Sequence, residues 1–310
     1  MENQSLITFL EEQNLRFHEN TAVKPYITIG IGGTVSLVIL VNDESQLKEL
    51  LIFLHQAQYK YVFLGGGSNV VFPDGHSPLI VVVNRTSGIF PEPENRVRVS
   101  SGVFIMDLMK WNIANRAGGM EFLAGIPGTM GGAAAVNAGA FGNSISTILE
   151  KAEIITPANE IKTVDNSYFE FTYRNSRFKY NDEVILNVTL RYTDAPADQI
   201  KEQVEANVAY RKKNHPGTGQ RSAGCFFKNP EIEGKKLSAG RLIEQAGFKG
   251  QTYNHLEVSA AHANFIINSS DATFRDICDL ESRIREGVSN TNHINLEREV
   301  IYISPDGKKY

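Results

Sequence analysis

Two segments of the chain are poor in side chains and leave backbone N–H groups open to a ligand. They read GGGSN, Gly65–Asn69, and GIPGTMGGAAAVNAGAFG, Gly125–Gly142. Glycine permits positive φ angles and close approach to the backbone, which suits a pyrophosphate group. One such segment alone is typical of a tight turn. Two of them indicate a large flat ligand that carries a diphosphate, such as a dinucleotide.

The familiar phosphate loops do not occur in either segment. No G-x-x-x-x-G-K-[ST] is present around Gly65 or Gly128, which argues against a P-loop. No G-x-G-x-x-G follows Leu64 or opens a helix, so a Rossmann nicotinamide site is not supported. The net charge of −4 gives no broad basic field, and local groups must therefore meet any anionic ligand.

A third segment, SAGCFFKNP, carries one of the two cysteines, Cys225. Its thiol has four candidate roles: a small buried apolar group, a metal ligand, a nucleophile or a proton donor. The cysteines lie far apart and form no C-x-x-C or His/Cys spacing, which disfavours a disulfide framework and a metal site. A nucleophile needs a base, and the sequence does not place His215 or His255. Cys278 shares an apolar helix face with Phe274, Ile277 and Ile284, so we expect a core position for it.

The composition is that of an ordinary globular protein, with 42% hydrophobic and 21% charged residues. A length of 310 residues favours two domains. The acidic N-terminus lacks a cationic start followed by an apolar run, so we expect no signal peptide. The apolar stretches are of strand length, which predicts no membrane span. We expect a cytoplasmic protein without a nucleic-acid or membrane partner.

A strand, a helix and a second strand lead into the first glycine segment. Val35–Val41 is apolar, Asp43 with Gln46 resembles a capping box, and leucines follow at helical spacing. The second strand, Tyr61–Leu64, runs directly into Gly65. This order predicts a β-α-β unit that ends in the glycine turn.

The remaining chain alternates between strand and helix patterns. Strands are predicted at Leu79–Asn84, Val97–Ser100, Ala152–Thr156, Phe169–Arg174, Glu183–Thr193, Ala263–Asn268 and Glu299–Ile303. Helices are predicted over 104–117, from Pro196 with Ile200, Val204 and Val208 on one face, over 237–246 and over 273–286. The helix from Pro196 leads into a basic loop, Arg211–Arg221, and the order beyond Pro230 is helix, strand, helix and strand. We place a domain boundary near residue 195 and expect a βαβ-like second domain.

These motifs, taken together, resemble a known family. GGGSN, EFLAGIPGTMGGAAAVNAGAFG, FTYRNSRF, SAGCFFKNP and LEREV occur in the order and spacing of bacterial UDP-N-acetylenolpyruvoylglucosamine reductases (MurB), and ITIGIGG fits their N-terminal signature. The resemblance covers about residues 24–303. It implies an α+β fold, with a two-lobed FAD-binding domain of the p-cresol methylhydroxylase type over 1–195, sub-lobes about 1–71 and 72–195, and a smaller α/β substrate-binding domain over 196–310. The last strand is expected to pack back on the first lobe.

The resemblance also implies an activity. Family members hold FAD non-covalently, take electrons from NADPH, and reduce UDP-N-acetylglucosamine enolpyruvate to UDP-N-acetylmuramate for peptidoglycan synthesis. Reduction needs a hydride at C3 of the enolpyruvyl group and a proton at C2, while negative charge builds on the carboxylate. The partners are therefore small molecules, and we expect a monomer without a metal. The short stretch Asp182–Ala195 leaves little room for the extra loop of some members, which favours the loop-lacking class.

Three residues match the catalytic positions of the family. Arg174 corresponds to the arginine that polarises the substrate carboxylate, although a surface arginine at a strand end is the plain alternative. Cys225 stands where most members carry the serine that protonates C2. Because an unperturbed thiol has a pKa of about 8.5, it is a better acid than a hydroxyl, and the resemblance makes Cys225 the general acid. Glu299 corresponds to the glutamate that stabilises the enolic intermediate, and we predict a pKa raised by burial. Glu297 would share its strand face and is not excluded.

The resemblance assigns binding roles to the remaining motif positions. Predicted cofactor-binding residues are Gly65, Gly66, Gly67, Ser68, Asn69, Gly125, Ile126, Pro127, Gly128, Thr129, Gly131, Gly132, Asn137 and Gly139. Predicted substrate-binding residues are Tyr173, Lys213, Lys228 and Asn229. Lys213 has less support, because KNHP has one residue more than the usual spacing before proline and a run of cations is more often a solvated face.

Two other readings stay open. A sugar or alcohol oxidase with the same flavin fold would often attach FAD through a histidine near the first glycine segment, where His76 is the nearest candidate. A flavin- or nucleotide-binding protein without enzymatic activity would leave TYRNS, the Cys225 segment and LEREV without a shared purpose.

Overall fold

The computed structural model describes residues 4–217 and 219–310, so part of the analysed N-terminus and one position of the predicted basic loop lie outside the described residues. The helices are α1 Gln4–Glu12, α2 Glu44–Gln56, α3 Ile105–Ala114, α4 Met130–Ala135, α5 Ala197–Asn214, α6 Ala239–Gln245 and α7 Phe274–Asn292. The strands are β1 Arg16–Ala22, β2 Thr34–Val41, β3 Tyr61–Leu64, β4 Val70–Val71, β5 His76–Asn84, β6 Ile89–Glu92, β7 Arg96–Ser100, β8 Ala117–Gly118, β9 Gly139–Ala140, β10 Asn143–Ser144, β11 Leu149–Ile155, β12 Ile161–Asp165, β13 Val184–Arg191, β14 Thr193–Asp194, β15 Ser222–Cys225, β16 Glu231–Ile232, β17 Lys235–Lys236, β18 Thr252–Tyr253, β19 Leu256–Val258, β20 Phe265–Asn268 and β21 Ile301–Tyr302.

The chain folds into two compact units that are both discontinuous in sequence. Unit 1 holds the described residues of Met1–Glu19, Leu37–Gly66 and Leu79–Ala209, and unit 2 holds those of Asn20–Ser36, Gly67–Pro78 and Tyr210–Tyr310. Residues 196–209 thus group with unit 1, beyond the boundary predicted at 195. The assignment of the two parts to cofactor and substrate stays a prediction.

The first core of unit 1 forms around helix α2. Asp43 caps this helix, because its side chain accepts hydrogen bonds from the backbone N–H groups of Ser45 (2.8 Å) and Gln46 (3.0 Å). The buried face of α2 packs in one cluster with residues of β2 and β5; its members include Leu47, Leu50, Leu51, Leu54, Leu37, Ile39, Ile80 and Val82. Strand β3 pairs with β5 in parallel, which confirms the predicted strand into the glycine turn.

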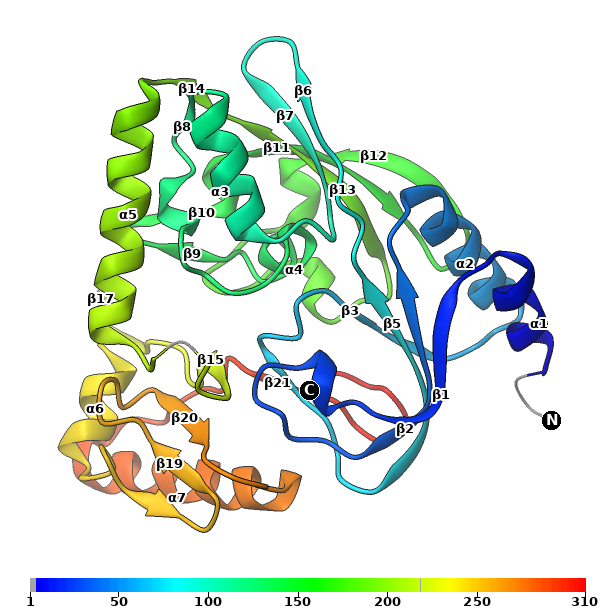
Figure 1. The fold of residues 1–310 in the computed structure, drawn as a ribbon. Coiled ribbons are helices and arrows are strands. Elements are labelled where there is room, and N and C mark those ends of the chain that lie inside the picture. Colours follow the sequence, from blue (N-terminus) through cyan, green and yellow to red (C-terminus); the bar gives the residue numbers. More distant parts are fainter. Residues whose placement is uncertain (1–3, 218) are drawn as a thin grey trace. The chain divides into compact units, whose positions relative to one another are not determined.

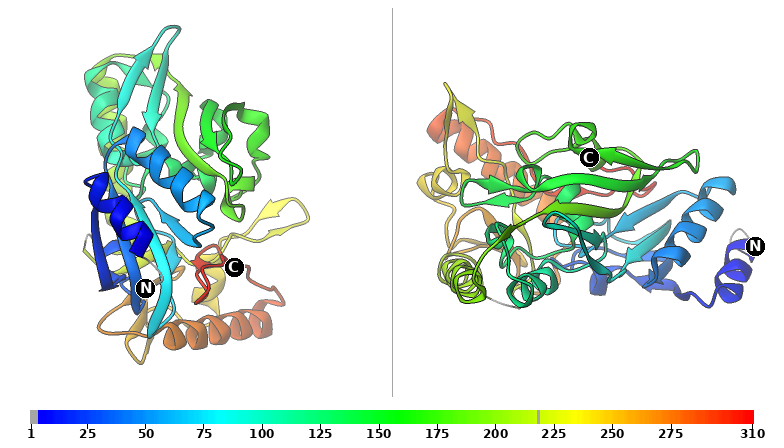
Figure 2. Two further views of the ribbon diagram at one scale, coloured as in Figure 1. Left: turned by 90° about the vertical axis from the view of Figure 1, so that its right-hand side faces the viewer. Right: turned by 90° about the horizontal axis from the view of Figure 1, so that it is seen from above.

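The second core of unit 1 lies on a five-stranded sheet with the order β12-β11-β13-β7-β6. Its strand pairs are antiparallel, and helices α3 and α5 contribute to the same apolar cluster. Ile200 and Val204 of α5 are buried there and Val208 packs against it, as the spacing predicted. Figures 1 and 2 show α5 side by side with α3.

Unit 2 contains a four-stranded sheet with the order β15-β20-β19-β18. All three strand pairs are antiparallel, so the predicted βαβ-like arrangement is wrong. The helix that follows β20 packs on α6 and does not return the chain to a parallel neighbour in this sheet. Strand β21 instead pairs in parallel with β4, in register Ile301 with Val70. The β16–β17 hairpin, yellow in Figure 2, extends away from the sheet.

Four local predictions need correction. Phe169–Arg174 is not a strand: Asn166–Phe169 is a 3-10 turn, and a tight turn follows at Thr172–Asn175. The first four residues of the predicted basic loop, 211–214, complete helix α5, where cations near the C-terminus oppose the helix dipole favourably. The last strand is only Ile301–Tyr302, although Arg298 forms an isolated bridge before it. Cys278 is half-buried and not in the core, because it lies beside the polar groups of Glu281 and Arg298.

Candidate active site

The two glycine segments touch each other within unit 1. A Cβ added to Gly65 would lie 2.1 Å from Thr129 Oγ1, and a Cβ added to Gly66 would lie 2.6 Å from Gly128 Cα. Contacts of this kind leave no room for a side chain, which is the physical reason for glycine at these positions. The structure thus brings together two stretches of exposed backbone that are separated by sixty residues in sequence, as a shared ligand site requires.

Arg85 is a residue of this region that the sequence motifs did not reveal. It follows β5, and its Nη1 donates a hydrogen bond to the Gly65 carbonyl oxygen at 2.7 Å. Its guanidinium carbon lies 5.3 Å from the ring centre of Phe104, the residue that bridges Thr129. Because the carbonyl and N–H of a trans peptide point in opposite directions, this bond turns the N–H of Gly66 away from Arg85. The only signal for Arg85 in the sequence was its position as a cation directly after β5, the strand that pairs with β3.

Arg174 lies in a tight turn of unit 1. Thr172 and Asn175 exchange two backbone hydrogen bonds, of 3.0 and 3.2 Å, and Arg174 has a φ of 56°. A left-handed conformation is uncommon for arginine and is found most often where the surroundings enforce it. Arg174 is half-buried, whereas Tyr173 beside it is 39% exposed.

The second glycine segment holds this turn in place. Asn137 donates from Nδ2 to the Thr172 carbonyl oxygen (2.9 Å), and its Oδ1 accepts from the N–H of Ser146 (3.1 Å). Ser176 Oγ donates to the Ala135 carbonyl oxygen at 2.7 Å. The cofactor-binding role predicted for Asn137 stays a prediction; in the structure its buried amide makes these bonds to the backbone. It therefore positions the Arg174 turn.

Cys225 and Glu299 come together within unit 2. Cys225 ends β15, is half-buried, forms no disulfide with another described residue and pairs across the sheet with Phe265. The N–H of Glu299 donates to the carbonyl oxygen of Phe226, the residue after Cys225, at 2.8 Å. Asn264, which is buried, accepts at Oδ1 from the N–H of Phe227 (2.9 Å) and donates from Nδ2 to its carbonyl (2.8 Å). Asn264 was not predicted, and the available signal was a polar residue beside the apolar run Phe265–Ile267.

Asn69 joins the same group from the end of the first glycine segment. Its Nδ2 donates to the Glu299 carbonyl oxygen at 3.4 Å, and its own carbonyl accepts from the N–H of Ile301 at 3.0 Å. The segment that carries Glu299 is thus hydrogen-bonded to the residues after Cys225 and to Asn69. Three motifs far apart in the sequence meet in unit 2.

The predicted substrate-binding residues of unit 2 have varied surroundings. Lys228 forms an ion pair with Glu297, which is 71% exposed, so Glu297 is the less suitable carboxylate for a proton-holding role. Asn229 accepts at Oδ1 from the N–H of Ala239, at the start of α6 (2.9 Å). Lys213 lies exposed on the last turn of α5. Of these three residues, Lys228 has the most direct connection to the segment that carries Glu299, because its backbone N–H donates to the Glu297 carbonyl oxygen.

His215, His255 and His76 of unit 2 each contact neighbouring side chains. His215 packs against His262 and Phe265, with ring centres 5.5 and 5.0 Å away. Burial, reinforced by Arg211 and His262, lowers the pKa of His215 to about 4. His255 Nδ1 shares a hydrogen bond with Ser270 Oγ at 2.7 Å, and His76 Nδ1 shares one with Thr34 Oγ1 at 3.2 Å.

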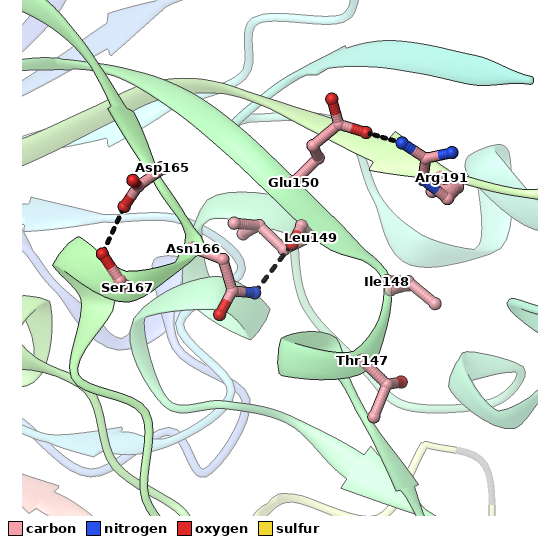
Figure 3. Close-up of a pocket in the computed structure, with 8 residues that line it drawn as sticks. All are labelled: Thr147, Ile148, Leu149, Glu150, Asp165, Asn166, Ser167 and Arg191. Atoms are coloured by element: carbon pink, nitrogen blue, oxygen red, sulfur yellow. Dashed lines mark hydrogen bonds and ion pairs between the residues drawn. The ribbon is translucent and has the colours of Figure 1, made fainter. Parts of the chain in front are cut away.

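A separate depression of about 440 Å³ lies on unit 1, at the ends of β11, β12 and β13 (Figure 3). Its polar groups satisfy one another: Arg191 Nη2 donates to Glu150 Oε2 (2.7 Å), and Ser167 Oγ donates to Asp165 Oδ1 (2.6 Å). Hydrogen bonds from Arg96 and Ser167 lower the pKa of Glu150 and Asp165, respectively. None of the predicted catalytic or binding residues lines this depression, and it has no part in the candidate active site.

The described residues contain neither a metal-binding cluster nor a membrane-spanning helix. No group of three or more His, Cys, Asp or Glu side chains within residues 4–217 and 219–310 is arranged to hold a metal ion. In the same residues, no helix combines the length and apolar character needed to cross a membrane.

Comparisons with known proteins agree with this geometry. A family model described as an FAD binding domain matches residues 35–165, and one described as the C-terminal domain of UDP-N-acetylenolpyruvoylglucosamine reductase matches residues 215–303. Proteins named UDP-N-acetylenolpyruvoylglucosamine reductase from Syntrophus aciditrophicus and Chlamydia pneumoniae are 32% and 35% identical over 289 and 280 residues, which cover 91% and 89% of this chain and 90% and 88% of theirs. A crystal structure of this reductase from Thermus caldophilus has a TM-score of 0.75 at 28% identity, over 93% of this chain and 98% of that one.

Fold and site together define an FAD-dependent oxidoreductase with an FAD-binding domain and a second, smaller domain, which confirms the predicted α+β class. Since relatives of more than 30% identity match about nine tenths of its length, the chain belongs to the UDP-N-acetylenolpyruvoylglucosamine reductase family.

The residues of unit 1 fit FAD on structural grounds. Thr129 is 1% exposed, and its Oγ1 has no hydrogen-bond partner among the described residues. A buried hydroxyl without a partner is costly and is typical of a place where a ligand or water completes the site. It lies against Gly65, beside the side-chain-free backbone of Gly66 and Gly128. These residues are the ones we expect to hold the FAD diphosphate.

Proposed function

We propose that this protein reduces the enolpyruvyl ether of UDP-N-acetylglucosamine to UDP-N-acetylmuramate, with NADPH as the reductant, in peptidoglycan precursor synthesis. The observation that supports this most directly is the hydrogen bond from Glu299 N–H to the Phe226 carbonyl. It joins a thiol-bearing segment to a carboxylate-bearing segment, as protonation of an enolic carbon requires. Both segments lie within residues 215–303, which the model of the reductase family's C-terminal domain matches.

Cys225 supplies the proton in this proposal. Bound FAD supplies the hydride that reaches C3 of the enolpyruvyl group. The Cys225 thiol then gives its proton to C2, so that the C=C bond gains one hydride and one proton, and the thiolate regains a proton from solvent. A thiol with an ordinary pKa of about 8.5 is mostly protonated at neutral pH and still releases its proton readily.

The nucleophile alternative for Cys225 has weaker support. A thiolate–imidazolium pair needs a histidine that holds a proton near neutral pH. His215 lies against Phe265, the strand partner of Cys225, but its lowered pKa of about 4 keeps it neutral. His255 is engaged with Ser270.

Arg174 and Glu299 stabilise the charge that develops. The Arg174 guanidinium binds the substrate carboxylate with two parallel hydrogen bonds and withdraws electron density from C2–C3. Glu299, with its proton retained, donates a hydrogen bond to the enolic intermediate. Tyr173, Lys228 and Asn229 contact the substrate, with Lys228 facing the diphosphate, and Lys213 makes a weaker, solvent-screened contribution.

Several finer assignments belong to the same proposal. The residues from Asp182 to Ala195 are occupied by β13 and β14, which favours the class without the extra substrate loop. Cys225 replaces the serine of most members. The enzyme acts as a cytoplasmic monomer. It holds FAD non-covalently, since His76, the nearest histidine, is paired with Thr34 and lies beyond the glycine segment.

One assay tests the function. The purified, FAD-loaded protein is supplied with NADPH, and absorbance at the NADPH band is followed with and without UDP-N-acetylglucosamine enolpyruvate. We expect oxidation of NADPH that depends on the substrate and forms UDP-N-acetylmuramate. Oxygen-dependent turnover of a sugar or alcohol without NADPH would support an oxidase instead. A protein that binds FAD but oxidises no NADPH with this substrate would refute the proposal.

A further inference from the structure

The segment that carries Glu299 is attached to helix α7 by the residue before it. Arg298 Nη1 donates to Glu281 Oε2 at 3.1 Å, and the guanidinium carbon lies 3.6 Å from the ring centre of Tyr302. Arg285, one turn further along α7, places Nη1 3.6 Å from the other oxygen of Glu281. The site motifs do not include Glu281, Arg285 or Tyr302.

This attachment is buried, which distinguishes it from an ordinary surface ion pair. Glu281 is 7% exposed and Tyr302 is 1% exposed, and the side chain of Arg298 is 18% exposed. Surface ion pairs contribute little to stability, but removal of one partner from a buried ion pair leaves an uncompensated buried charge. A planar guanidinium held between a carboxylate and an aromatic ring also has few alternative orientations. Arg298 is therefore fixed in direction as well as in position.

The backbone transmits this constraint to Glu299. Arg298 forms an isolated antiparallel bridge with Phe227, and the adjacent Glu299 N–H donates to Phe226. Successive side chains of an extended segment point to opposite sides. The side chain of Arg298 thus secures the segment from the α7 side, while Glu299 is presented on the other. Helix α7 is a suitable support because it has a capping box and four buried aliphatic residues.

We propose that Glu281 and Arg298 are positioning residues that hold the Glu299 carboxylate in its productive place. The proposal rests on the role given to Glu299 above. It goes beyond that role because it predicts that a pair which touches neither substrate nor cofactor controls one half of the reaction. A displacement of about 1 Å at a reacting group is enough to lower a rate by up to roughly a hundredfold.

Stopped-flow measurements on the FAD-loaded, full-length enzyme separate the two half-reactions. The variants are Arg298→Met, Arg298→Lys and Glu281→Gln, with Arg283→Met as the matched control. Arg283 is also on α7 and also lies over a tyrosine, Tyr253, at 5.9 Å. For Arg298→Met and Glu281→Gln we expect reoxidation of reduced flavin by the enolpyruvyl substrate to slow by about tenfold or more, with flavin reduction by NADPH changed less than about twofold. Arg298→Lys should recover part of the loss, and the control should match the parent protein.

A double-variant cycle then tests whether Arg298 acts through Glu299. If it does, Arg298→Met added to Glu299→Gln slows reoxidation by less than about twofold further. Multiplicative losses would overturn the proposal, and so would equal losses in both half-reactions, which a general structural role predicts. An unchanged rate in Glu299→Gln would also overturn it. Failure of the proposed function is recognised separately, because the parent enzyme would then show no reoxidation by this substrate.

Discussion

At the scale of single residues, the proposed role of Cys225 as the general acid has the clearest chemical consequence. A thiol is a stronger acid than a hydroxyl, so under this proposal Cys225 gives its proton to C2 without a new partner. The same thiol is open to alkylation and oxidation. We expect iodoacetamide to inactivate this enzyme, and turnover that persists with Cys225 fully alkylated would contradict its role as the acid.

Substitutions at Cys225 separate acidity from packing. Under the proposed mechanism Cys225→Ser should retain substantial activity, because a serine hydroxyl also carries a proton that it can donate. Cys225→Ala should allow reduction of the flavin by NADPH but slow substrate reduction by roughly 10²–10⁴-fold, the usual contribution of a general acid. Rapid-mixing absorbance of the flavin measures both steps. Normal substrate reduction in the alanine variant would mean that the proton has another source.

Arg85 leads to a prediction about cofactor binding. Loss of its hydrogen bond to the Gly65 carbonyl frees the peptide that orients the Gly66 N–H. We expect Arg85→Met to weaken FAD binding by about tenfold, the effect of one charge-assisted hydrogen bond of about 1.5 kcal/mol. Titration of the apoprotein with FAD, followed by flavin fluorescence, measures the dissociation constant.

Arg98→Met is the control for Arg85→Met. Arg98 also lies over a phenylalanine, with 4.2 Å between its guanidinium carbon and the Phe90 ring centre, but it makes its ion pair with Glu44, on helix α2. Its FAD affinity should be close to that of the parent. Equal losses in both variants would attribute the effect to general destabilisation of unit 1.

At the scale of elements, helix α3 contains an unusual buried amide. Asn112 is fully buried, and neither its Oδ1 nor its Nδ2 has a hydrogen-bond partner among the described residues. Leucine has the same number and branching of side-chain heavy atoms as asparagine and a higher helix propensity. We expect Asn112→Leu to raise the free energy of unfolding by about 1 kcal/mol, because it removes two unsatisfied polar groups without leaving a partner behind. Urea denaturation monitored by circular dichroism measures the change.

Asn207 on helix α5 is the matched control for this substitution. It is also buried, but Nδ2 donates to the Glu121 carbonyl (2.7 Å) and Oδ1 accepts from Gln203 (3.0 Å). Asn207→Leu should therefore lower the free energy of unfolding by about 1–3 kcal/mol. Destabilisation of similar size by both leucine variants would show that Asn112 has a partner, such as an ordered water molecule.

At the scale of the whole molecule, the half-buried histidines of unit 2, His215 and His262, predict sensitivity to acid. The folded-state pKa of His215 is about 4, against 6.5 for the free side chain. Between pH 6.5 and 4 the unfolded chain binds a proton that the folded chain does not, so the free energy of unfolding falls as the pH is lowered through this window. Above pH 6.5 and below pH 4 the folded and unfolded chains bind the same number of protons at His215, so this group causes no further change in the free energy of unfolding with pH. Burial lowers the pKa of His262 as well, in the same direction.

His215→Phe should reduce this dependence. The ring keeps its packing against His262 and Phe265, but the titrating group is removed. Urea denaturation at pH 5 and pH 7.5 should show a smaller loss of stability in the variant than in the parent, by about 1–2 kcal/mol. Carboxylates contribute equally to both proteins, so the difference isolates His215. An identical loss would mean that water reaches the imidazole in the folded state.

Local patterns in the sequence determined the regular elements of this protein. The Asp43 cap of α2, the apolar face of α5 and the strand that ends at Leu64 need only neighbouring residues, and each is found as predicted. The capping box predicted with Asp43 is half formed, because the Gln46 side chain donates to the Gln13 carbonyl instead. Irregular stretches were less predictable. The segment Phe169–Arg174 has a strand-like composition, but hydrogen bonds from Asn137, thirty-five residues before Thr172, help to hold it as a turn. A distant partner decided the local conformation there, and no pattern within the segment records it.

The motifs of the sequence were likewise enough to predict the family and its cofactor, because five ordered segments are very specific. Only the tertiary structure decided which side chains tie the motif segments together. The amides of Asn137 and Asn229, at predicted binding positions, bond to the protein backbone, and Arg85, Asn264 and Glu281, which match no motif, hold segments that do. The physical reason is that hydrogen bonds and buried ion pairs between distant parts of a chain depend on distance in space, which spacing in the sequence does not specify.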